Sequence, residues 1–372
     1  MTALAPAKPG QTLAEVDTPA LILELDAFEA NIARLNQALA GRNIRVRTHA
    51  KTHKCPEIAL RQIKAGAIGA CCQKVSEAEA MVDGGVADVL VSNEVVGAQK
   101  LARLARLAKR ARIGICVDHP QQIEALGAAV QVEQAEVDVY VEIDVGARRC
   151  GVAPGEPALR LARRIAATSG LRFAGLQAYQ GSAQHVRTMQ EREAKIKVAI
   201  ESARMTRAMI EADGIRCPIV TGAGSGSFMF EAASGVYDEL QPGSYIFMDA
   251  DYARNDWAPP LPRFEHSLFV LTTVMSHAVP ERLVVDAGIK ASSVDSGLPT
   301  VWQRPGLDFV RASDEHGVIE VKGGGTAPQL GDKLLLVPGH CDPTVNLYDW
   351  YVCMRGGIVE AIWPITARGA LA

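Results

Sequence analysis

The chain has 372 residues, which exceeds the usual size of a single domain and predicts one large domain with a smaller one. Hydrophobic residues make up 48% of the chain, which is enough for a sizeable core and argues against an intrinsically disordered protein. The 39 Lys and Arg residues nearly balance the 42 Asp and Glu residues, and the net charge of −3 argues against a nucleic-acid or membrane-surface partner.

The N-terminal segment, residues 1–11, is rich in Ala, Pro and Gly and has no apolar core of signal-peptide length. No apolar run in the sequence is long enough to cross a bilayer. The eight Cys residues are scattered, apart from Cys71 and Cys72, and form no C-x-x-C motif, which is typical of reduced buried thiols. We therefore expect a soluble cytoplasmic protein with no membrane partner.

The first predicted strand covers residues 20–25, with the sequence ALILEL. Asp26 then has Glu29 three positions further on, which is the arrangement of a helix capping box. Phe28, Ile32 and Leu35 would lie on one face of the helix that follows.

A regular alternation of strands and helices follows, and it decides the fold class. Helical patterns lie between most of eight short apolar runs, and no dinucleotide-binding fingerprint follows the first strand. The pattern predicts an α/β fold, a (β/α)₈ TIM-type barrel over residues 27–260. The expected barrel strands are residues 44–47, 67–71, 86–91, 112–117, 137–143, 173–178, 218–221 and 237–240.

The composition changes after Pro259 and Pro260, because helical periodicity vanishes and short apolar runs alternate with Gly, Pro and Asp turns. These runs predict a second, C-terminal β-rich domain. The early strand precedes the barrel and would pair with this domain, so we assign residues 1–26 and 261–372 to it. The expected strands of this domain are residues 267–274, 282–285, 318–321, 333–337 and 357–362.

Polar residues follow nearly every expected barrel strand, at the end of a barrel where active sites are built. The segment TGAGSGS, residues 221–227, is the clearest motif among them. Its glycines and small hydroxyl residues would offer free backbone N–H groups to an anion, and barrels often bind a phosphate after strand seven. A flexible Gly-Ser turn is the alternative, but the position favours a phosphate site.

A phosphate site together with a lysine at the end of the first strand suggests pyridoxal phosphate (PLP), which needs a Schiff-base lysine and a phosphate anchor. The segment THAKTHK offers two candidates, Lys51 and Lys54. Most lysines are solvated surface charges, so neither Lys51 nor Lys54 is persuasive as a Schiff-base lysine without support from neighbouring residues.

The expected second domain carries the segment HCDPTVNLYD, which starts at His340. On an extended segment His340 and Asp342 would share one face while Cys341 points away. An imidazole and a carboxylate form a competent half-site for a divalent cation and leave coordination positions open for catalysis. A turn with a capping Asp is the alternative reading, because H-x-D is common by chance.

These segments, taken in order, resemble the D-threonine aldolase/D-serine dehydratase family of alanine-racemase-like (fold type III) PLP enzymes. The resemblance covers nearly the whole chain, from about Asp17 onward. It rests on THAKTHK, VEIDVGARRCGV, GLQAYQG, TGAGSGSF, ELQPGSYIFMD, VDAGIKASS, SDEHG and HCDPTVNLYD. The family combines a PLP-binding barrel with a C-terminal β-domain, which matches the pattern read from the sequence.

The resemblance implies residue roles around the cofactor. Lys51, and not Lys54, would be the Schiff-base lysine, and Arg149 would face the pyridine nitrogen. Gln73 would line the ring. The phosphate and ring contacts would come from Tyr179, Thr221, Gly222, Ala223, Gly224 and Ser225.

The resemblance also implies that His340 and Asp342 are metal ligands, and this motif separates two reactions within the family. The dehydratase branch resembles H-x-C, with a thiolate suited to zinc, and the aldolase branch resembles H-x-D, with a harder carboxylate. Asp342 therefore favours retro-aldol cleavage of D-threonine and related D-β-hydroxy-α-amino acids to glycine and an aldehyde. Manganese is the expected metal, with magnesium or zinc as alternatives.

His185 is the candidate base for the hydroxyl proton, since the pKa range of histidine suits this task, and His53 is the second candidate. A histidine at a helix start with no role is the alternative for His185. Three other functions stay open: a D-serine or D-threo-3-hydroxyaspartate dehydratase, an amino-acid racemase, and a PLP carrier without chemistry. The fold class also predicts a homodimer.

Overall fold

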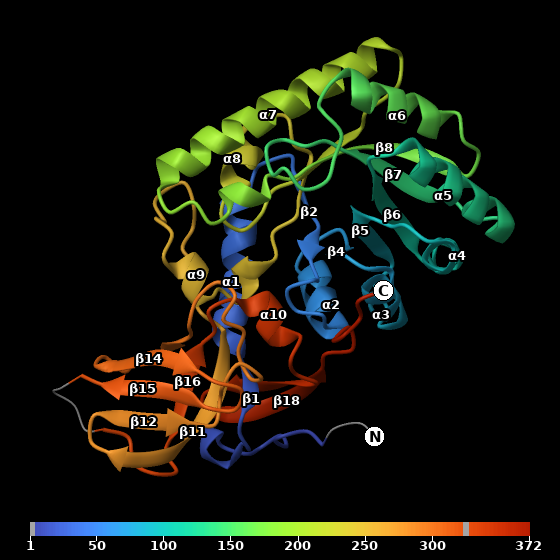
Figure 1. Cartoon of the computed structure of the whole chain (residues 1–372). Coiled ribbons are helices and arrows are strands. Elements are labelled where there is room, and N and C mark those ends of the chain that lie inside the picture. Colours follow the sequence, from blue (N-terminus) through green and yellow to red (C-terminus); the bar gives the residue numbers. More distant parts are fainter. Residues whose placement is uncertain (1–3, 323–326) are drawn as a thin grey trace.

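The computed structural model describes residues 4–322 and 327–372. The larger body is a parallel barrel ringed by helices, and a mostly antiparallel sheet packs below it (Figure 1). The strands of the barrel are β2 (Arg45–Val46), β3 (Thr48–His49), β4 (Ala70–Cys72), β5 (Asp88–Glu94), β6 (Arg112–Val117), β7 (Val137–Glu142), β8 (Leu171–Ala178), β9 (Ile219–Gly222) and β10 (Glu239–Leu240).

The barrel closes through its first strand, which is interrupted at Arg47. Strand β2 pairs with β10 on one side and β3 pairs with β4 on the other, so the two short pieces act as a single strand. In the described part of the chain the barrel therefore has eight strand positions, as the sequence predicts. The expected runs 112–117 and 137–143 match β6 and β7 to within one residue.

The helices follow the strands in the alternation that the periodicity predicts. The helical pattern of residues 56–64 predicts a helix there, and α2 begins and ends at these residues. The helices are α1 (Leu25–Leu39), α2 (Pro56–Lys64), α3 (Val75–Asp83), α4 (Ala98–Leu107), α5 (Pro120–Glu133), α6 (Glu156–Ala166), α7 (Met189–Ala212), α8 (Phe228–Ala233), α9 (Ala250–Ala253) and α10 (Cys341–Val345), with short 3₁₀ turns η1 (Leu13–Glu15), η2 (Gly181–Ala183) and η3 (Ser244–Ile246).

The second sheet takes one strand from the beginning of the chain, because β1 (Ala20–Glu24) lies between two late strands. It pairs antiparallel with β11 and parallel with β17, as expected for a strand that precedes the barrel. The late strands are β11 (Leu268–Val279), β12 (Arg282–Val285), β13 (Thr300–Val301), β14 (Leu307–Ala312), β15 (Gly317–Val321), β16 (Lys333–Val337), β17 (Trp350–Arg355) and β18 (Ile358–Pro364). The domain boundaries at residues 26/27 and 260/261 stay a prediction, and residues 1–3 and 323–326 lie outside the described residues.

Two local expectations are wrong. The first helix is capped by the Glu24 side chain, which accepts a hydrogen bond from the Ala27 N–H, so Asp26 already lies inside the helix. The metal motif is not extended, because His340 precedes the short helix α10 and Asp342 lies in its first turn. The sequence also gave no signal for β13, β14 and β17.

Apolar side chains fill the lower barrel interior, below the polar carboxyl ends of the strands. Cys71, Leu90, Cys116 and Tyr140 are all at most 2% exposed and pack there with Ala174 and Ile219. No helix among the described residues has both the length and the hydrophobicity needed to cross a membrane.

Candidate active site

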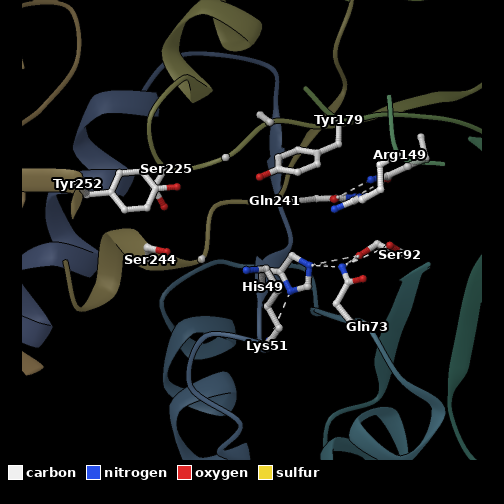
Figure 2. A pocket seen from close by; sticks show the side chains of 14 residues that line it. His49, Lys51, Gln73, Ser92, Arg149, Tyr179, Ser225, Gln241, Ser244 and Tyr252 are labelled. Atoms are coloured by element: carbon white, nitrogen blue, oxygen red, sulfur yellow. Dashed lines mark hydrogen bonds between the residues drawn. The ribbon is translucent and has the colours of Figure 1, made fainter. Parts of the chain in front are cut away.

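A cavity of about 300 Å³ opens at the carboxyl ends of the barrel strands (Figure 2). This is the end at which barrel enzymes place their active sites. Its walls carry two cations, several amides and hydroxyls, and few apolar side chains. The lining residues are His49, Lys51, Gln73, Ser92, Arg149, Gln177, Tyr179, Ala223, Gly224, Ser225, Gln241, Gly243, Ser244 and Tyr252.

The two candidate lysines have different surroundings. Lys51 lines the cavity and forms an ion pair with Asp342. Lys54 instead pairs with the buried Glu77 of α3. Burial disfavours the charged form of Lys51, but the Asp342 carboxylate and Tyr179 more than offset it, so the pKa of Lys51 is raised. Only Lys51 can therefore reach a molecule bound in the cavity.

The His340 and Asp342 pair lies against the same lysine. Burial would raise the pKa of Asp342, but Lys51 and His340 hold it well below its usual range, so this carboxylate is ionised. The Nδ1 atom of His340 lies 2.8 Å from an Asp295 carboxylate oxygen. A carboxylate at Nδ1 fixes the ring and leaves Nε2 as the ligand atom, which is the usual arrangement around a metal-binding histidine.

The glycine-rich loop after β9 forms one wall of the cavity. Ala223 has a φ of 68°, which is a strained backbone conformation for a residue with a side chain. A Cβ at Gly224 would meet the Gln184 Oε1 atom at 2.5 Å, so a larger residue there would displace the buried Gln184 amide. The Ser225 hydroxyl accepts a hydrogen bond from the Tyr245 N–H, which ties this loop to the one after β10.

The first two residues of the predicted phosphate motif lie behind the wall. Thr221 and Gly222 belong to β9 and are not among the lining residues. The Thr221 hydroxyl is buried, donates to the Glu239 carboxylate at 3.0 Å and accepts from the Gln241 amide at 2.8 Å. Thr221 and Gly222 both accept hydrogen bonds from Gln241, and in this way they hold the loop after β10 in place. The phosphate contact of Thr221 and Gly222 stays a prediction.

Arg149, Tyr179 and Gln73 all line the cavity, as predicted. The guanidinium carbon of Arg149 lies 5.8 Å from the centre of the Tyr179 ring, and the two side chains lie on the same side in Figure 2. The Gln73 amide lies 2.9 Å from Nε2 of His49 and 3.3 Å from the Ser92 hydroxyl. Burial and the nearby Lys51 charge lower the pKa of His49 well below its usual value, so this imidazole is neutral.

Neither histidine proposed as a base lines the cavity. His185 is half-exposed and its Nδ1 atom lies 2.5 Å from an Asp251 carboxylate oxygen. Its ring packs on Tyr252, which does line the cavity, with 5.2 Å between ring centres. His53 is fully buried, and burial lowers its pKa to about 3. The structure therefore places His185 behind the lining residue Tyr252 and His53 inside the protein.

Several lining residues were not among the predicted site residues. His49, Gln241 and Ser244 belong to polar segments that follow expected strands, so their position after a strand was the available signal. Tyr252 lies on the four-residue helix α9, and no sequence pattern pointed to it.

The residues present fit both implied groups. Lysine and arginine cations, three serine hydroxyls and the backbone of two glycine-containing loops face one cavity, and this donor set suits a phosphorylated aromatic ring such as PLP. His340 and Asp342 offer one imidazole and one ionised carboxylate to a divalent cation. Elsewhere in the described residues, Glu94, Asp118 and Cys150 have ligand atoms within 4.8 Å of one another.

Comparison with known proteins decides the family. The family description "Alanine racemase, N-terminal domain" matches residues 23–251, and "Putative serine dehydratase domain" matches residues 267–354. The D-threonine aldolase of Arthrobacter sp is 51% identical over 365 residues, which cover 98% of this chain and 96% of that protein. The chain belongs to the D-threonine aldolase family. It is accordingly an enzyme, an aldehyde-lyase.

Two further relatives support the family assignment. The 3-hydroxy-D-aspartate aldolase of Paracoccus denitrificans (strain Pd 1222) is 49% identical over 98% of this chain and 95% of its own. The crystal structure of D-threonine aldolase from Filomicrobium marinum superposes with a TM-score of 0.98 at 52% identity, covering 99% of this chain and 100% of that one. The family likeness thus extends over both the barrel and the second sheet.

Proposed function

We propose that this enzyme catalyses PLP- and divalent-metal-dependent retro-aldol cleavage of D-threonine and related D-β-hydroxy-α-amino acids to glycine and an aldehyde. The ion pair between Lys51 and Asp342 carries this proposal. It joins the proposed cofactor lysine of the barrel to the proposed metal ligand of the C-terminal segment. A substrate bound between them would meet the cofactor at its amine and the metal at its β-hydroxyl.

The cofactor would be held at both ends of the cavity. The loop of Ala223, Gly224 and Ser225 would bind the phosphate, with Gly243 and Ser244 in the neighbouring loop. Arg149 would face the ring nitrogen, and Tyr179 and Gln73 would line the ring. PLP supplies an electron sink for the carbanion that remains when the Cα–Cβ bond breaks. An arginine beside the ring nitrogen would moderate that sink, since it cannot protonate the nitrogen as a carboxylic acid would.

His340 and Asp342 would hold the metal, with manganese preferred because a carboxylate and an imidazole suit it. A bound divalent cation supplies Lewis acidity, which lowers the pKa of a hydroxyl group that it contacts. The dehydratase branch would instead need a thiolate ligand. Cys341 is fully buried and its Sγ atom donates to Asp342 Oδ1 at 3.4 Å, which supports Asp342 as the ligand that faces Lys51.

His185 would accept the proton of the β-hydroxyl, directly or through water. Asp251 holds the Nδ1 side of its ring, so Nε2 is the atom left to take the proton. Asp251 is itself fixed by Arg187 and Arg254. These contacts orient the ring before substrate arrives. By analogy with its fold class we also propose that the enzyme acts as a homodimer.

Product analysis tests the proposed reaction. Purified protein is incubated with PLP, Mn²⁺ and D-threonine, and glycine, acetaldehyde, ammonia and 2-oxobutanoate are assayed. Glycine and acetaldehyde in equal amounts are expected. Ammonia with 2-oxobutanoate would establish a dehydratase instead, and L-threonine from D-threonine would establish a racemase.

A further inference from the structure

The connection from β12 to β13 contains a segment, Ser293–Ser296, that contacts the proposed metal ligand His340. The His340 Nδ1 atom donates a hydrogen bond to the Asp295 carboxylate at 2.8 Å. The hydroxyls of Ser293 and Ser296 donate to the same carboxylate at 2.7 Å and 3.1 Å. The Asp295 side chain is 50% exposed, so these hydroxyls, and not burial, orient it toward the imidazole.

The backbone of the segment is also fixed beside His340. The Ser293 N–H donates to the Thr344 hydroxyl at 3.1 Å, and that hydroxyl donates to the His340 carbonyl at 2.7 Å. A Cβ at Gly339 would meet the carbonyl oxygen of Gly297 at 2.0 Å, so the chain after the segment packs directly on the residue that precedes His340. Side-chain and backbone contacts therefore hold the segment and the metal ligand together.

The same segment is linked to the proposed base. The Ser296 carbonyl accepts a hydrogen bond from the Nη2 atom of Arg254 at 2.9 Å. Arg254 also forms an ion pair with Asp251, whose other oxygen holds His185. A separate backbone link does not involve the Arg254 side chain, because the Asp251 N–H donates to the Gly339 carbonyl at 3.2 Å. Contacts thus lead from the base to the segment, and from the segment to the metal ligand.

We propose that this segment aligns the proposed metal ligand with the proposed base. Asp295 positions His340 for the divalent cation, while Ser296 holds Arg254 and thereby positions His185. Neither Asp295 nor Arg254 lines the cavity, so both are positioning residues that act through a neighbour. The inference rests on the proposed function, in which one imidazole binds the cation and the other accepts the hydroxyl proton. Proton transfer needs the base within hydrogen-bond reach of that hydroxyl, which a fixed spacing of the two imidazoles provides.

Calorimetric titration of chelator-treated, PLP-loaded enzyme with Mn²⁺ tests the contact with the metal ligand. Asp295→Ala frees the His340 ring, and its Mn²⁺ affinity is expected to fall about 10–100-fold, as for other partners of metal-binding histidines. Asp295→Asn keeps an oxygen that accepts from Nδ1–H and should recover most of this loss. Asp308→Ala is the matched control, because Asp308 is similarly exposed at 53% but pairs with Lys322. Its affinity should stay within about twofold of wild type.

Two arginine variants test the link to the base. Arg254→Ala and Arg187→Ala each remove a guanidinium from Asp251, but only Arg254 binds the segment. Both variants are expected to lower kcat at saturating Mn²⁺. Only Arg254→Ala should also weaken Mn²⁺ binding, by about fivefold, which is the effect of one lost hydrogen bond. Equal Mn²⁺ affinities in the two variants would overturn the proposed link.

The outcomes separate this inference from the proposed function. The four substituted side chains are 41% to 55% exposed, so all the variants are expected to fold, which urea unfolding checks. Wild-type Mn²⁺ affinity in Asp295→Ala would overturn the inference and leave the proposed metal site standing. A wild type that binds no Mn²⁺, or a His340→Ala variant that binds it as tightly as wild type, would overturn the proposed metal site itself.

Discussion

Lys51 and Lys54 are three residues apart, yet their partners give them different roles. Lys51 meets Asp342 at the cavity, whereas Lys54 neutralises Glu77, whose other oxygen accepts the N–H groups of Gln73 and Lys74. The second lysine therefore supports the start of α3. A Thr-His pair precedes each lysine in the segment THAKTHK, so the motif cannot distinguish Lys51 from Lys54. The sequence shows the spacing of the residues but not the partner of each side chain.

Substitution of each lysine should produce a different failure. Lys51→Ala is expected to abolish cleavage and the absorbance of lysine-bound PLP while the protein stays folded. Lys54→Ala leaves a buried carboxylate without its cation and should cost about 3–5 kcal/mol of unfolding free energy. Absorbance spectra and urea unfolding of both variants provide the check. Lysine-bound PLP that persists in Lys51→Ala would contradict the assignment.

His185 is expected to act on the proton and not on cofactor binding. His185→Asn should lower kcat by about 10²–10⁴-fold, which is the range of general acid–base catalysis, with little change in PLP affinity. Steady-state kinetics and cofactor titration measure the two effects separately. An unchanged kcat would remove His185 from the proposed mechanism and return the role of base to another group.

Half of the cavity wall could be predicted at the level of single residues, because seven of the fourteen lining residues are among the predicted site residues. Lys51, Gln73, Arg149 and Tyr179 follow different strands, and the barrel geometry brings them together as expected. The exceptions have physical causes. Thr221 and Gly222 belong to strand β9, and the Thr221 hydroxyl bonds to Glu239 and Gln241 and does not line the cavity. Tyr252 belongs to the four-residue helix α9, which has no periodic pattern in the sequence.

The glycine-rich loop and helix α8 are coupled by a buried chain of hydrogen bonds. The Gly226 N–H donates to the Gln184 side chain, whose amide donates to the Ser227 hydroxyl. That hydroxyl donates to Glu231 at 2.9 Å, and the second Glu231 oxygen is buried without a partner. Burial raises the pKa of Glu231 to about 7. The chain supports the proposed phosphate loop from behind.

This raised pKa predicts a pH dependence of stability. Between the ordinary pKa of Glu231 and about 7, the folded protein binds a proton that the unfolded chain does not, so stability falls as the pH rises through this window. Glu231→Gln keeps the acceptor for Ser227 and removes the titration. Its stability relative to wild type should increase by about 3 kcal/mol across the window. Urea unfolding at about pH 5 and about pH 8 measures this, and parallel pH profiles would contradict it.

At the level of elements, the alternation of strands and helices in the barrel could be predicted, whereas the break in its first strand and the short helix α10 could not. The helix α2 and strand β6 match their expected bounds. The first barrel strand divides at Arg47, whose side chain binds Glu239 and Asp88 inside the barrel, and hydrophobicity does not reveal such a break. The five-residue helix α10 has too few residues for a helical period to appear in the sequence.

At the scale of the whole molecule, one site takes residues from a loop of the barrel and from a loop of the second sheet. Strand β1 is built into the second sheet, and α1 then leads into the barrel, so the chain passes between the two bodies early and again after residue 260 (Figure 1). Asp342 reaches Lys51 of the same chain. We therefore expect the proposed cofactor lysine and metal ligand to act together within one subunit.

Mixing two inactive variants tests this arrangement. Lys51→Ala and Asp342→Ala are each expected to be inactive, and subunits of the two are unfolded together and refolded as a mixture. Because each chain would build its own site, every site stays defective and no activity is expected to return. Recovery toward about a quarter of the wild-type activity would show that the ligands serve a partner subunit.

In the proposed reaction, carbon–carbon cleavage depends on a divalent metal held by His340 and Asp342 beside Lys51. The most direct test is glycine and acetaldehyde production from D-threonine by chelator-treated, PLP-loaded enzyme before and after addition of Mn²⁺, with His340→Ala in parallel. Chelation is expected to stop cleavage, Mn²⁺ is expected to restore it in wild type, and the variant is expected to stay inactive with its lysine-bound PLP absorbance intact. Full cleavage in the chelated wild type, or in His340→Ala, would contradict this metal dependence.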